Sequence, residues 1–273
     1  FRDTWPRLAC KPDDFIRTSE ERHKRGAQEL WKKIDEKGDI YLGHYEGLYC
    51  VGCEAYYTEK DLKQPGNVCP LHNKPVETVK EESYFFRLSR YEQPLLELYR
   101  KNPGFIRPES RRNEVVSFVQ AGLTDLSVSR TTFQWGIPVP GDPRHVMYVW
   151  FDALANYYTA LLEPEDNRRF WPASVHVVGK DILRFHAVYW PAFLMAAGYS
   201  EAELPQQVYA HGFLTYGGQK MSKSLRNTVG PVALAEALSP TVGVDTLRYC
   251  LMRAISFGQD GDFSMQDMLQ RYA

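Results

Sequence analysis

The stretch VHVVGKDILRFHAVYW, Val175 to Trp190, decides the expected fold. It opens with a short apolar run that is typical of a buried strand, and Gly179 ends that run. From Leu183 to Ala197 the apolar residues recur with helical spacing. A strand that passes through a glycine into a helix is the building unit of a parallel α/β sheet.

The segments on either side extend this pattern. Residues 146–151 and 208–213 are apolar runs that we interpret as two further buried strands, and residues 153–162 predict the helix after the first of them. The order strand, helix, strand, helix, strand predicts a parallel α/β sheet, in which ligands bind at the carboxyl ends of the strands. The rim of a site is therefore expected at Trp150, Asp152, Gly179, Lys180, Asp181, His211 and Gly212.

The remaining segments are assigned more coarsely. Leu30, Trp31 and Ile34 form an apolar stripe on a charged helix that Gly38 ends. Residues 41–80 are rich in glycine, cysteine and aromatic residues, and they predict a small module built from loops. Other helices are expected at residues 94–102, 114–122, 231–238 and 245–253, and a region rich in turns at 127–144.

Composition limits the class of protein. The 273 residues carry a formal net charge of −1, so a contact with phosphates has to be local. No apolar run reaches the roughly 18 residues of a membrane span, and residues 1–10 show no signal-peptide pattern. The chain lacks an initiator methionine, so we expect a piece of a longer protein. Because no apolar run of that length is present, no membrane partner is expected. Five cysteines are too few for a disulfide scaffold, which favours a reducing, cytoplasmic location.

Four residues have the spacing of a metal site. Cys50 and Cys53 are followed by Cys69 and His72, a C-x2-C-x15-C-x2-H pattern. Three thiolates and one imidazole complete a tetrahedral Zn²⁺ shell, so the ion would be structural. The alternative is a redox pair, but this CxxC does not open a helix in a thioredoxin-like unit. Cys10 and Cys250 have no such partners and are expected to be buried as small apolar residues.

The helix after Gly179 carries a possible pocket wall. Ile182, His186 and Trp190 are spaced four apart, so they share one face, which can be either core or the lining of an apolar pocket. Asp181 can bind ribose hydroxyls or simply be a solvated carboxylate at a helix start. Gly179-Lys180 is not a P-loop, because Asp181 stands where that motif needs Ser or Thr.

A last motif lies at GGQKMSKSLRN, Gly217 to Asn227. Two lysines three apart are usually solvated, and a glycine pair indicates a tight turn. The complete pentapeptide KMSKS, however, resembles the signature of class I aminoacyl-tRNA synthetases. Segments along nearly the whole chain, among them HVMYVWFDALANY, VVGKDILRFHAVYWPAFLMAAG and HGFLTYGGQKMSKS, resemble the methionyl-tRNA synthetases in particular.

The resemblance implies an α/β fold: part of the Rossmann-type parallel sheet of a class I synthetase, with an inserted zinc-bearing connective module. Residues 1–22 would end the first half of the catalytic domain, and residues 23–147 would form the connective insertion, with a zinc knuckle at about 44–80. Residues 148–213 would be the second half of the catalytic domain. Residues 214–273 would hold the KMSKS loop and the start of a helical stem-contact region.

The resemblance also implies an activity and its residues. The family activates L-methionine with ATP and Mg²⁺ and transfers it to tRNA(Met), and Lys220 and Lys223 would stabilise the charge that develops on the phosphates. One zinc would be held by the four Cys and His ligands. The ATP site would comprise Gly179, Asp181, His211, Gly212, Lys220, Met221, Ser222, Lys223 and Ser224. The methionine pocket would comprise Trp150, Ala153, Leu154, Tyr157, Ile182, His186 and Trp190.

The chain departs from the family pattern in several places. The HIGH signature, the acidic residue that holds the methionine ammonium and the anticodon-binding domain are not found in the sequence, so we expect an incomplete catalytic core. Arg226 and Asn73 stand where the family commonly has glycine. A non-catalytic zinc-bearing fragment therefore stays open as an alternative, as does a class I synthetase for another amino acid. A metal-free redox protein rests on the CxxC pair alone.

Overall fold

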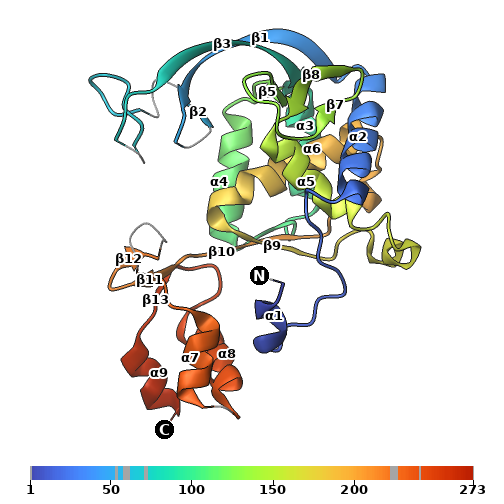
Figure 1. Cartoon of the computed structure of the whole chain (residues 1–273). Helices are drawn as coiled ribbons and strands as arrows, with labels where there is room; N and C mark the ends of the chain where they lie inside the picture. Colours follow the sequence, from blue (N-terminus) through green and yellow to red (C-terminus); the bar gives the residue numbers. More distant parts are fainter. Residues whose placement is uncertain are drawn as a thin grey trace.

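A computed structural model of the chain describes residues 2–52, 55–57, 62–70, 73–221, 227–239 and 241–272. Figure 1 shows an α/β body in the middle, a long curved hairpin above it and a small helical lobe below it. Within the described residues, no helix is both long and apolar enough to cross a membrane.

The body is built on a three-stranded parallel sheet. The strands are β4 (Ile106–Arg107), β10 (Val208–His211) and β9 (His176–Gly179), in the order β4-β10-β9. Both pairings are parallel, and His211 lies beside Gly179 at the carboxyl ends. Two of the three predicted strands are thus confirmed in part. The third predicted strand, residues 146–151, is not part of this sheet. The second parallel neighbour of β10 is instead the two-residue strand β4.

The predicted strand at residues 146–151 is split between two elements. Val146 and Met147 end β8 (Asp142–Met147), which pairs antiparallel with β6 (Ser129–Arg130) and β7 (Pro138–Val139). Tyr148 then caps α5 (Val149–Thr159), so the rest of the apolar run is helical. A continuous apolar run fits a buried strand and a buried helix equally, which is why the sequence misplaced this boundary.

Helices cover the sheet on the side of the main core. They are α2 (Glu21–Glu36), α3 (Glu92–Lys101), α4 (Glu109–Gln120), α5, and α6 (Trp190–Ala196). A π-helical turn, η5 (Phe185–Tyr189), leads directly into α6. Trp31 packs edge-on against Phe151 at 5.1 Å between ring centroids, and both side chains are buried. The predicted stripe on α2 is therefore confirmed as core. Short 3₁₀ turns join these elements at Leu88–Tyr91, Glu165–Phe170, Lys180–Ile182 and Glu201–Glu203.

A long antiparallel hairpin projects from the body. Strands β1 (Ile40–Cys50) and β3 (Glu77–Phe86) pair from Ile40–Phe86 to Tyr49–Glu77, and they form the arch in Figure 1. Two short strands, β2 (Ala55–Tyr57) and β5 (Leu126–Ser127), extend this sheet. The module was predicted to consist of loops, which is wrong for its two long sides, because glycine and cysteine obscured the alternating pattern of the strands.

The C-terminal lobe has its own small core. Helices α7 (Pro231–Leu238), α8 (Gly243–Ala254) and α9 (Met265–Tyr272) bury Leu234, Ala235, Leu247, Cys250 and Met268. A further three-stranded sheet joins β11 (Leu214–Tyr216) to β12 (Gln219–Lys220) and β13 (Gly261–Asp262). Helix α9 and this sheet were not predicted.

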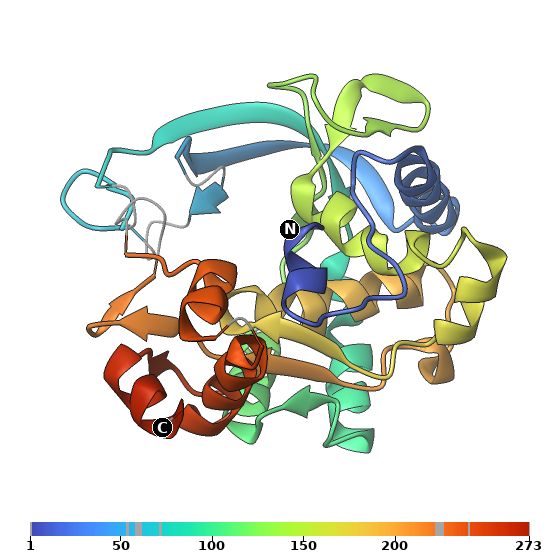
Figure 2. The same cartoon turned by 60° about the horizontal axis from the view of Figure 1, so that its bottom comes forward.

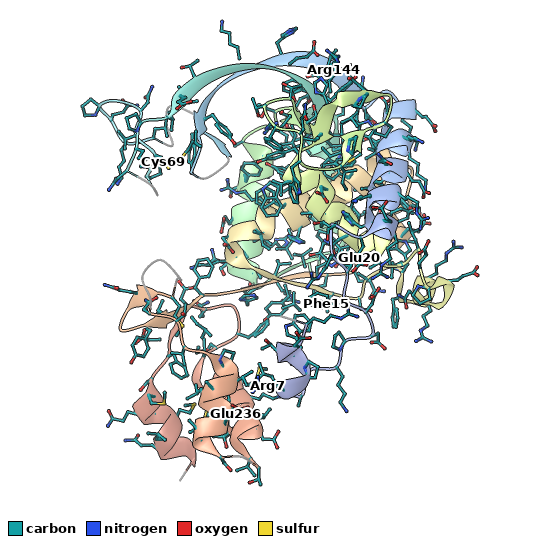
Figure 3. All side chains as sticks on the ribbon, viewed as in Figure 1. Arg7, Phe15, Glu20, Cys69, Arg144 and Glu236 are labelled. Atoms are coloured by element: carbon teal, nitrogen blue, oxygen red, sulfur yellow. The ribbon has the colours of Figure 1, made fainter. Side chains whose placement is uncertain are left out.

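The N-terminal helix α1 (Thr4–Arg7) lies beside the C-terminal lobe, as Figure 2 shows. Arg7 donates to Glu236, and these two side chains are labelled next to each other in Figure 3. Arg248 donates to the Leu8 carbonyl at 3.2 Å and to the Cys10 sulfur at 3.4 Å. Cys10 is therefore half-buried and hydrogen-bonded rather than buried as predicted, whereas Cys250 is buried.

Candidate functional site

The predicted nucleotide residues meet at the carboxyl ends of β9 and β10. His211 pairs with Gly179, and Asp181 follows in the next turn of chain. A Cβ on Gly179 would lie 2.6 Å from Asp181 Oδ1 and 3.9 Å from His211 Cε1, so the carboxylate folds back over the glycine. Asp181 and His211 are both exposed. The sequence rule that places ligand groups at strand ends thus brings these three residues to one edge.

Gly212 lies in close contact with another segment of the chain. A Cβ at this position would be 2.1 Å from the carbonyl oxygen of Gln259, so only a residue without a side chain fits. Next to this contact is a cavity of about 210 Å³, which His211, Gly212 and Phe213 line on one side. The close approach fixes the end of β10 against the C-terminal lobe.

The predicted methionine residues come from α5 and from the segment after β9. Trp150 lies in the first turn of α5, not at the end of a strand, and the same holds for Asp152. The Trp150 ring stacks on Phe185 at 3.5 Å between centroids and 8° between planes. Phe185 was not predicted, because its position next to His186 places it off the four-residue spacing. The π-helical turn η5 carries both Phe185 and His186, and each of them contacts a residue of α5.

Tyr157 and His186 are hydrogen-bonded to each other, and each polar atom of the two side chains has a partner. His186 Nδ1 is 2.9 Å from the Ile182 carbonyl, so this nitrogen carries the proton and Nε2 accepts. The Tyr157 hydroxyl lies 2.6 Å from Nε2 and therefore donates to it. Burial lowers the pKa of His186 and raises that of Tyr157 to about 12, so both groups are neutral at pH 7.

Four other predicted pocket residues differ in burial. Leu154 and Trp190 are buried in the main core, whereas Ala153 and Ile182 are half-buried. The Trp190 ring lies 6.0 Å from that of Tyr157, and the indole nitrogen of Trp190 has no hydrogen-bond partner among the described residues. Leu154 and Trp190 are thus part of the core, whereas the half-buried Ala153 and Ile182 are partly accessible to a ligand.

His176 is a pocket neighbour that the sequence analysis missed. Its ring lies 4.1 Å from Tyr157 and 6.2 Å from His186. Burial, with a smaller contribution from nearby His186, lowers the pKa of His176 to about 4. Its place inside an apolar run that was predicted to be a buried strand was the available signal, because a buried polar residue is the informative exception.

Asp152 is held by His23, another residue that the sequence analysis missed. His23 on α2 is fully buried, and its Nε2 lies 2.7 Å from Asp152 Oδ1. Its Nδ1 lies 2.8 Å from the Thr159 hydroxyl. His23 therefore connects the two ends of α5. The sequence gave no spacing signal for this contact, because His23 and Asp152 are far apart in the chain.

Only part of the KMSKS stretch lies within the described residues. Gly217 and Gly218, with φ values of 59° and 74°, form the two-residue turn between β11 and β12. The backbone of Lys220 ends β12, and Met221 follows. Ser222, Lys223, Ser224 and Arg226 lie outside the described residues.

Two of the four predicted zinc ligands are described. Cys50 ends β1, Cys69 lies beyond β2, just after the bridge between Lys63 and Val68, and both cysteines are buried. The Asn73 amide donates to the Cys69 carbonyl at 2.9 Å, and the Cys69 amide donates to the Lys74 carbonyl at 2.9 Å. Asn73 has a φ of 51°, a conformation that asparagine tolerates better than most residues, so it can replace glycine here.

Cys53 and His72 lie outside the described residues. Within the part of the chain that is described, no group of three or more His, Cys, Asp or Glu is arranged to hold a metal ion. The tight turn at Cys69 and the burial of both described thiols suit a ligand pair, since structural zinc sites place their cysteines on such turns.

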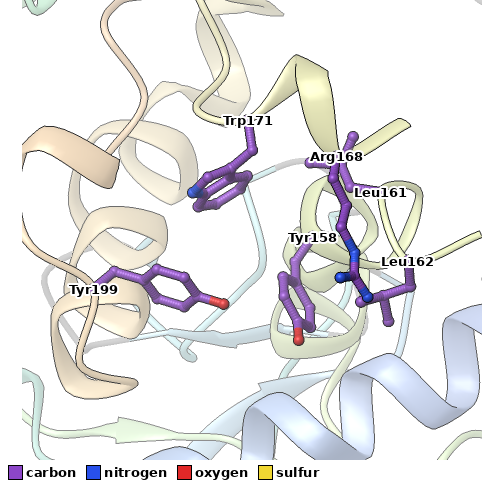
Figure 4. Close-up of a pocket in the computed structure, with 6 residues that line it drawn as sticks. All are labelled: Tyr158, Leu161, Leu162, Arg168, Trp171 and Tyr199. Atoms are coloured by element: carbon purple, nitrogen blue, oxygen red, sulfur yellow. The ribbon is translucent and has the colours of Figure 1, made fainter. Parts of the chain in front are cut away.

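A separate cavity of about 280 Å³ lies away from these residues. Figure 4 shows the rings of Tyr158, Trp171 and Tyr199 around it, with Arg168 at one side. The Trp171 and Tyr199 ring centroids are 5.4 Å apart. It lies at the far end of α5 and before the start of β9, and none of its lining residues belongs to the predicted site.

The fold is that of class I aminoacyl-tRNA synthetases. The family model described as tRNA synthetases class I (M) matches residues 1–273, and the chain belongs to this family. The methionine–tRNA ligase of Brucella suis biovar 1 (strain 1330) is 56% identical over 276 residues, and the alignment covers 99% of this chain and 52% of that protein. The methionine–tRNA ligase of Rickettsia conorii (strain ATCC VR-613 / Malish 7) is 54% identical, with the same two coverages.

A solved structure is also similar. The crystal structure of Mycobacterium tuberculosis methionyl-tRNA synthetase bound by methionyl-adenylate superposes with a TM-score of 0.89 at 49% identity, covering 99% of this chain and 53% of that one. The chain thus spans about half the length of the relatives that it matches.

Proposed function

We propose that this chain is the central part of a methionine–tRNA ligase, which activates L-methionine with ATP and transfers it to tRNA(Met). The observation that carries the proposal is the junction at the end of β9. There Gly179, Asp181 and His211 form a polar edge, and the next residue, Ile182, is the first of the residues proposed to contact methionine on this segment. An amino-acid side chain and a nucleotide could thus bind on adjoining segments of one chain.

The chemistry of the pocket supports methionine as the amino acid. Tyr157 and His186 satisfy each other, and the Ile182 carbonyl takes the remaining histidine proton. A thioether is a weak acceptor that does not require a hydrogen bond, so it would leave nothing unpaired among these groups. A hydroxyl or amide side chain would need a partner and would have to break the pair, which costs about 0.5–1.5 kcal/mol per hydrogen bond.

The nucleotide would lie at the polar edge. Asp181 is proposed to bind the ribose, with His211 and Gly212 next to the adenosine, and Mg²⁺ would accompany the phosphates. Lys220 and Lys223 of the KMSKS stretch would approach the phosphates as the methionine carboxylate attacks the α-phosphate. That role is electrostatic, because phosphoryl chemistry of this kind needs positioning and charge stabilisation.

One structural zinc is proposed in the connective module. Cys50, Cys53, Cys69 and His72 would hold it, and the ion would fix the tip of the β1–β3 hairpin. The domain limits proposed for the chain are residues 1–22, 23–147, 148–213 and 214–273, as the resemblance implies. A cytoplasmic location is proposed from the low cysteine content.

ATP–pyrophosphate exchange tests the proposal on the full-length gene product. Methionine should support exchange, and valine and cysteine should not, because the amino-acid pocket is built for a thioether. Exchange with valine or cysteine at a rate similar to that with methionine would support another class I synthetase. No exchange with any amino acid would support the non-catalytic alternative.

A further inference from the structure

A short acidic segment of the C-terminal lobe, Gln259 to Asp262, touches three parts of the proposed site. The Gln259 carbonyl lies against Gly212. Asp260 accepts from Lys180 Nζ at 2.6 Å and from the Phe213 amide at 2.8 Å, which joins the ends of β9 and β10. Asp262 contacts the hairpin that leads into KMSKS.

The contact of Asp262 is made through a single carboxylate oxygen. Oδ1 accepts from the Thr215 hydroxyl at 2.7 Å and from the Gly218 amide at 2.9 Å. Thr215 lies on β11 as the cross-strand partner of Lys220, and Gly218 lies in the turn. One oxygen therefore holds both a strand and the tip of the hairpin, directly before the first lysine of the motif.

The hairpin needs such support. Strands β11 and β12 pair through only two residue pairs, Thr215–Lys220 and Tyr216–Gln219, and a hairpin of this size is marginal by itself. Parallel pairing with β13 adds backbone bonds to β11 only. Among the described residues, the side chain of Asp262 contacts the glycine turn by accepting a hydrogen bond from the Gly218 amide. Hydrogen bonds to an ionised carboxylate are shorter and stronger than neutral ones.

We propose that Asp262 is a positioning residue for the adenylation reaction. Its carboxylate fixes the direction in which the chain leaves the hairpin at Lys220. Asp260, two residues earlier, ties the same segment to Lys180 at the end of β9, so the nucleotide edge and the hairpin that ends at Lys220 are held together. This inference rests on the function proposed above.

The test compares three variants of the full-length protein in methionine-dependent ATP–pyrophosphate exchange. Asp262→Ala removes the acceptor and should lower kcat by about tenfold to a hundredfold, because displaced catalytic groups cost rates of this order. Asp262→Asn keeps an oxygen acceptor and should recover a large part of kcat. Asp267→Ala is the matched control, since Asp267 is an exposed acid on α9 with no described contact to the hairpin.

Two further readouts separate positioning from a general loss of structure. The KM for methionine should stay within about twofold of the parent value, because Asp262 does not touch the amino-acid pocket. Amide hydrogen exchange at residues 214–221 should become faster in Asp262→Ala and stay unchanged in Asp267→Ala.

Each result decides the inference. Exchange rates of Asp262→Ala equal to those of Asp267→Ala would overturn it while the proposed function stands. A parallel rise in KM for methionine and fall in kcat would also overturn it, since that would indicate a general structural defect. If the unmodified protein shows no methionine-dependent ATP–pyrophosphate exchange, the proposed function is overturned. In that case, amide hydrogen exchange at residues 214–221 that is the same in Asp262→Ala as in the unmodified protein would overturn the hairpin contact as well.

Discussion

At the scale of single residues, the pair formed by Tyr157 and His186 can be tested directly. Tyr157→Phe removes the hydroxyl that donates to His186 Nε2 and leaves a buried acceptor unpaired. We expect the KM for methionine to rise by up to about tenfold, since an unsatisfied buried group costs about 1 kcal/mol or more. Steady-state ATP–pyrophosphate exchange on the full-length protein measures this change.

Tyr158→Phe is the control for that substitution. Tyr158 is the next residue along α5, but its ring faces the separate cavity in Figure 4. Its hydroxyl accepts from Lys33 at 3.5 Å, a weak contact outside the proposed pocket. An equal rise in KM in both variants would contradict the role of the Tyr157–His186 pair.

His176 predicts a dependence of stability on pH. Its pKa is lowered from 6.5 to about 4 in the folded protein, so the unfolded protein binds the proton more readily. The stability that comes from neutral His176 is complete above pH 6.5 and is lost as the pH falls toward 4. A shift of this size corresponds to about 3 kcal/mol.

Urea unfolding between pH 7 and pH 4 can measure that loss in the wild type and in His176→Gln. We expect a smaller loss in the variant, because glutamine does not titrate. His44→Gln is the control for the substitution itself, since His44 is an exposed histidine on β1. A variant that loses as much stability as the wild type would show that His176 is not the group responsible.

At the scale of elements, Gly212 determines how β10 meets the C-terminal lobe. Gly212→Ala would place a Cβ 2.1 Å from the Gln259 carbonyl, so the two segments must move apart. We expect a loss of about 1–3 kcal/mol in the free energy of unfolding, the usual cost of overpacking. Gly230→Ala is the control, because the nearest atom is 3.9 Å away and the backbone conformation is ordinary. Thermal unfolding of both variants that gives equal midpoints would contradict the close approach.

The zinc proposal is an element-scale prediction about the tip of the β1–β3 hairpin. Cys50→Ser should lower the zinc content from about one ion per chain toward zero, because a four-ligand structural site depends on every thiolate. Cys250→Ser is the control, since this buried cysteine belongs to the C-terminal lobe. Metal analysis of the purified proteins measures both. Zinc retained in Cys50→Ser would remove Cys50 from the proposed ligands.

The elements also show what sequence can predict. The stripe on α2 and the whole of α7 followed from helical spacing and from Pro231. The start of α5 did not, because Val149 and Phe151 continue the apolar run of β8 without a break. The strand β4 is too short to carry a pattern, and the π-helical turn at Phe185–Tyr189 has no signature in the spacing.

For the site, the strand-end rule brought Gly179, Asp181 and His211 together correctly. The strand-end rule cannot predict contacts between segments that are distant in the sequence. His23 with Asp152, and Asp262 with the Gly218 amide, depend on the tertiary fold and leave no local pattern in the sequence.

At the scale of the whole molecule, the 273-residue chain itself should be inactive. It spans about half the length of the relatives that it matches. We expect ATP–pyrophosphate exchange by the full-length product and none by residues 1–273 alone, because the residues proposed here complete only part of a nucleotide site. Exchange by residues 1–273 at a rate similar to that of the full-length product would contradict this prediction.

The parallel sheet has a further consequence for how the protein can be handled. Val177 on β9 and Val175 just before it are 57% and 44% exposed, although strands of parallel sheets are normally covered on both faces. Within the described residues, β9 pairs only with β10. An uncovered apolar edge of this kind favours self-association, so residues 1–273 expressed alone should aggregate with rising concentration.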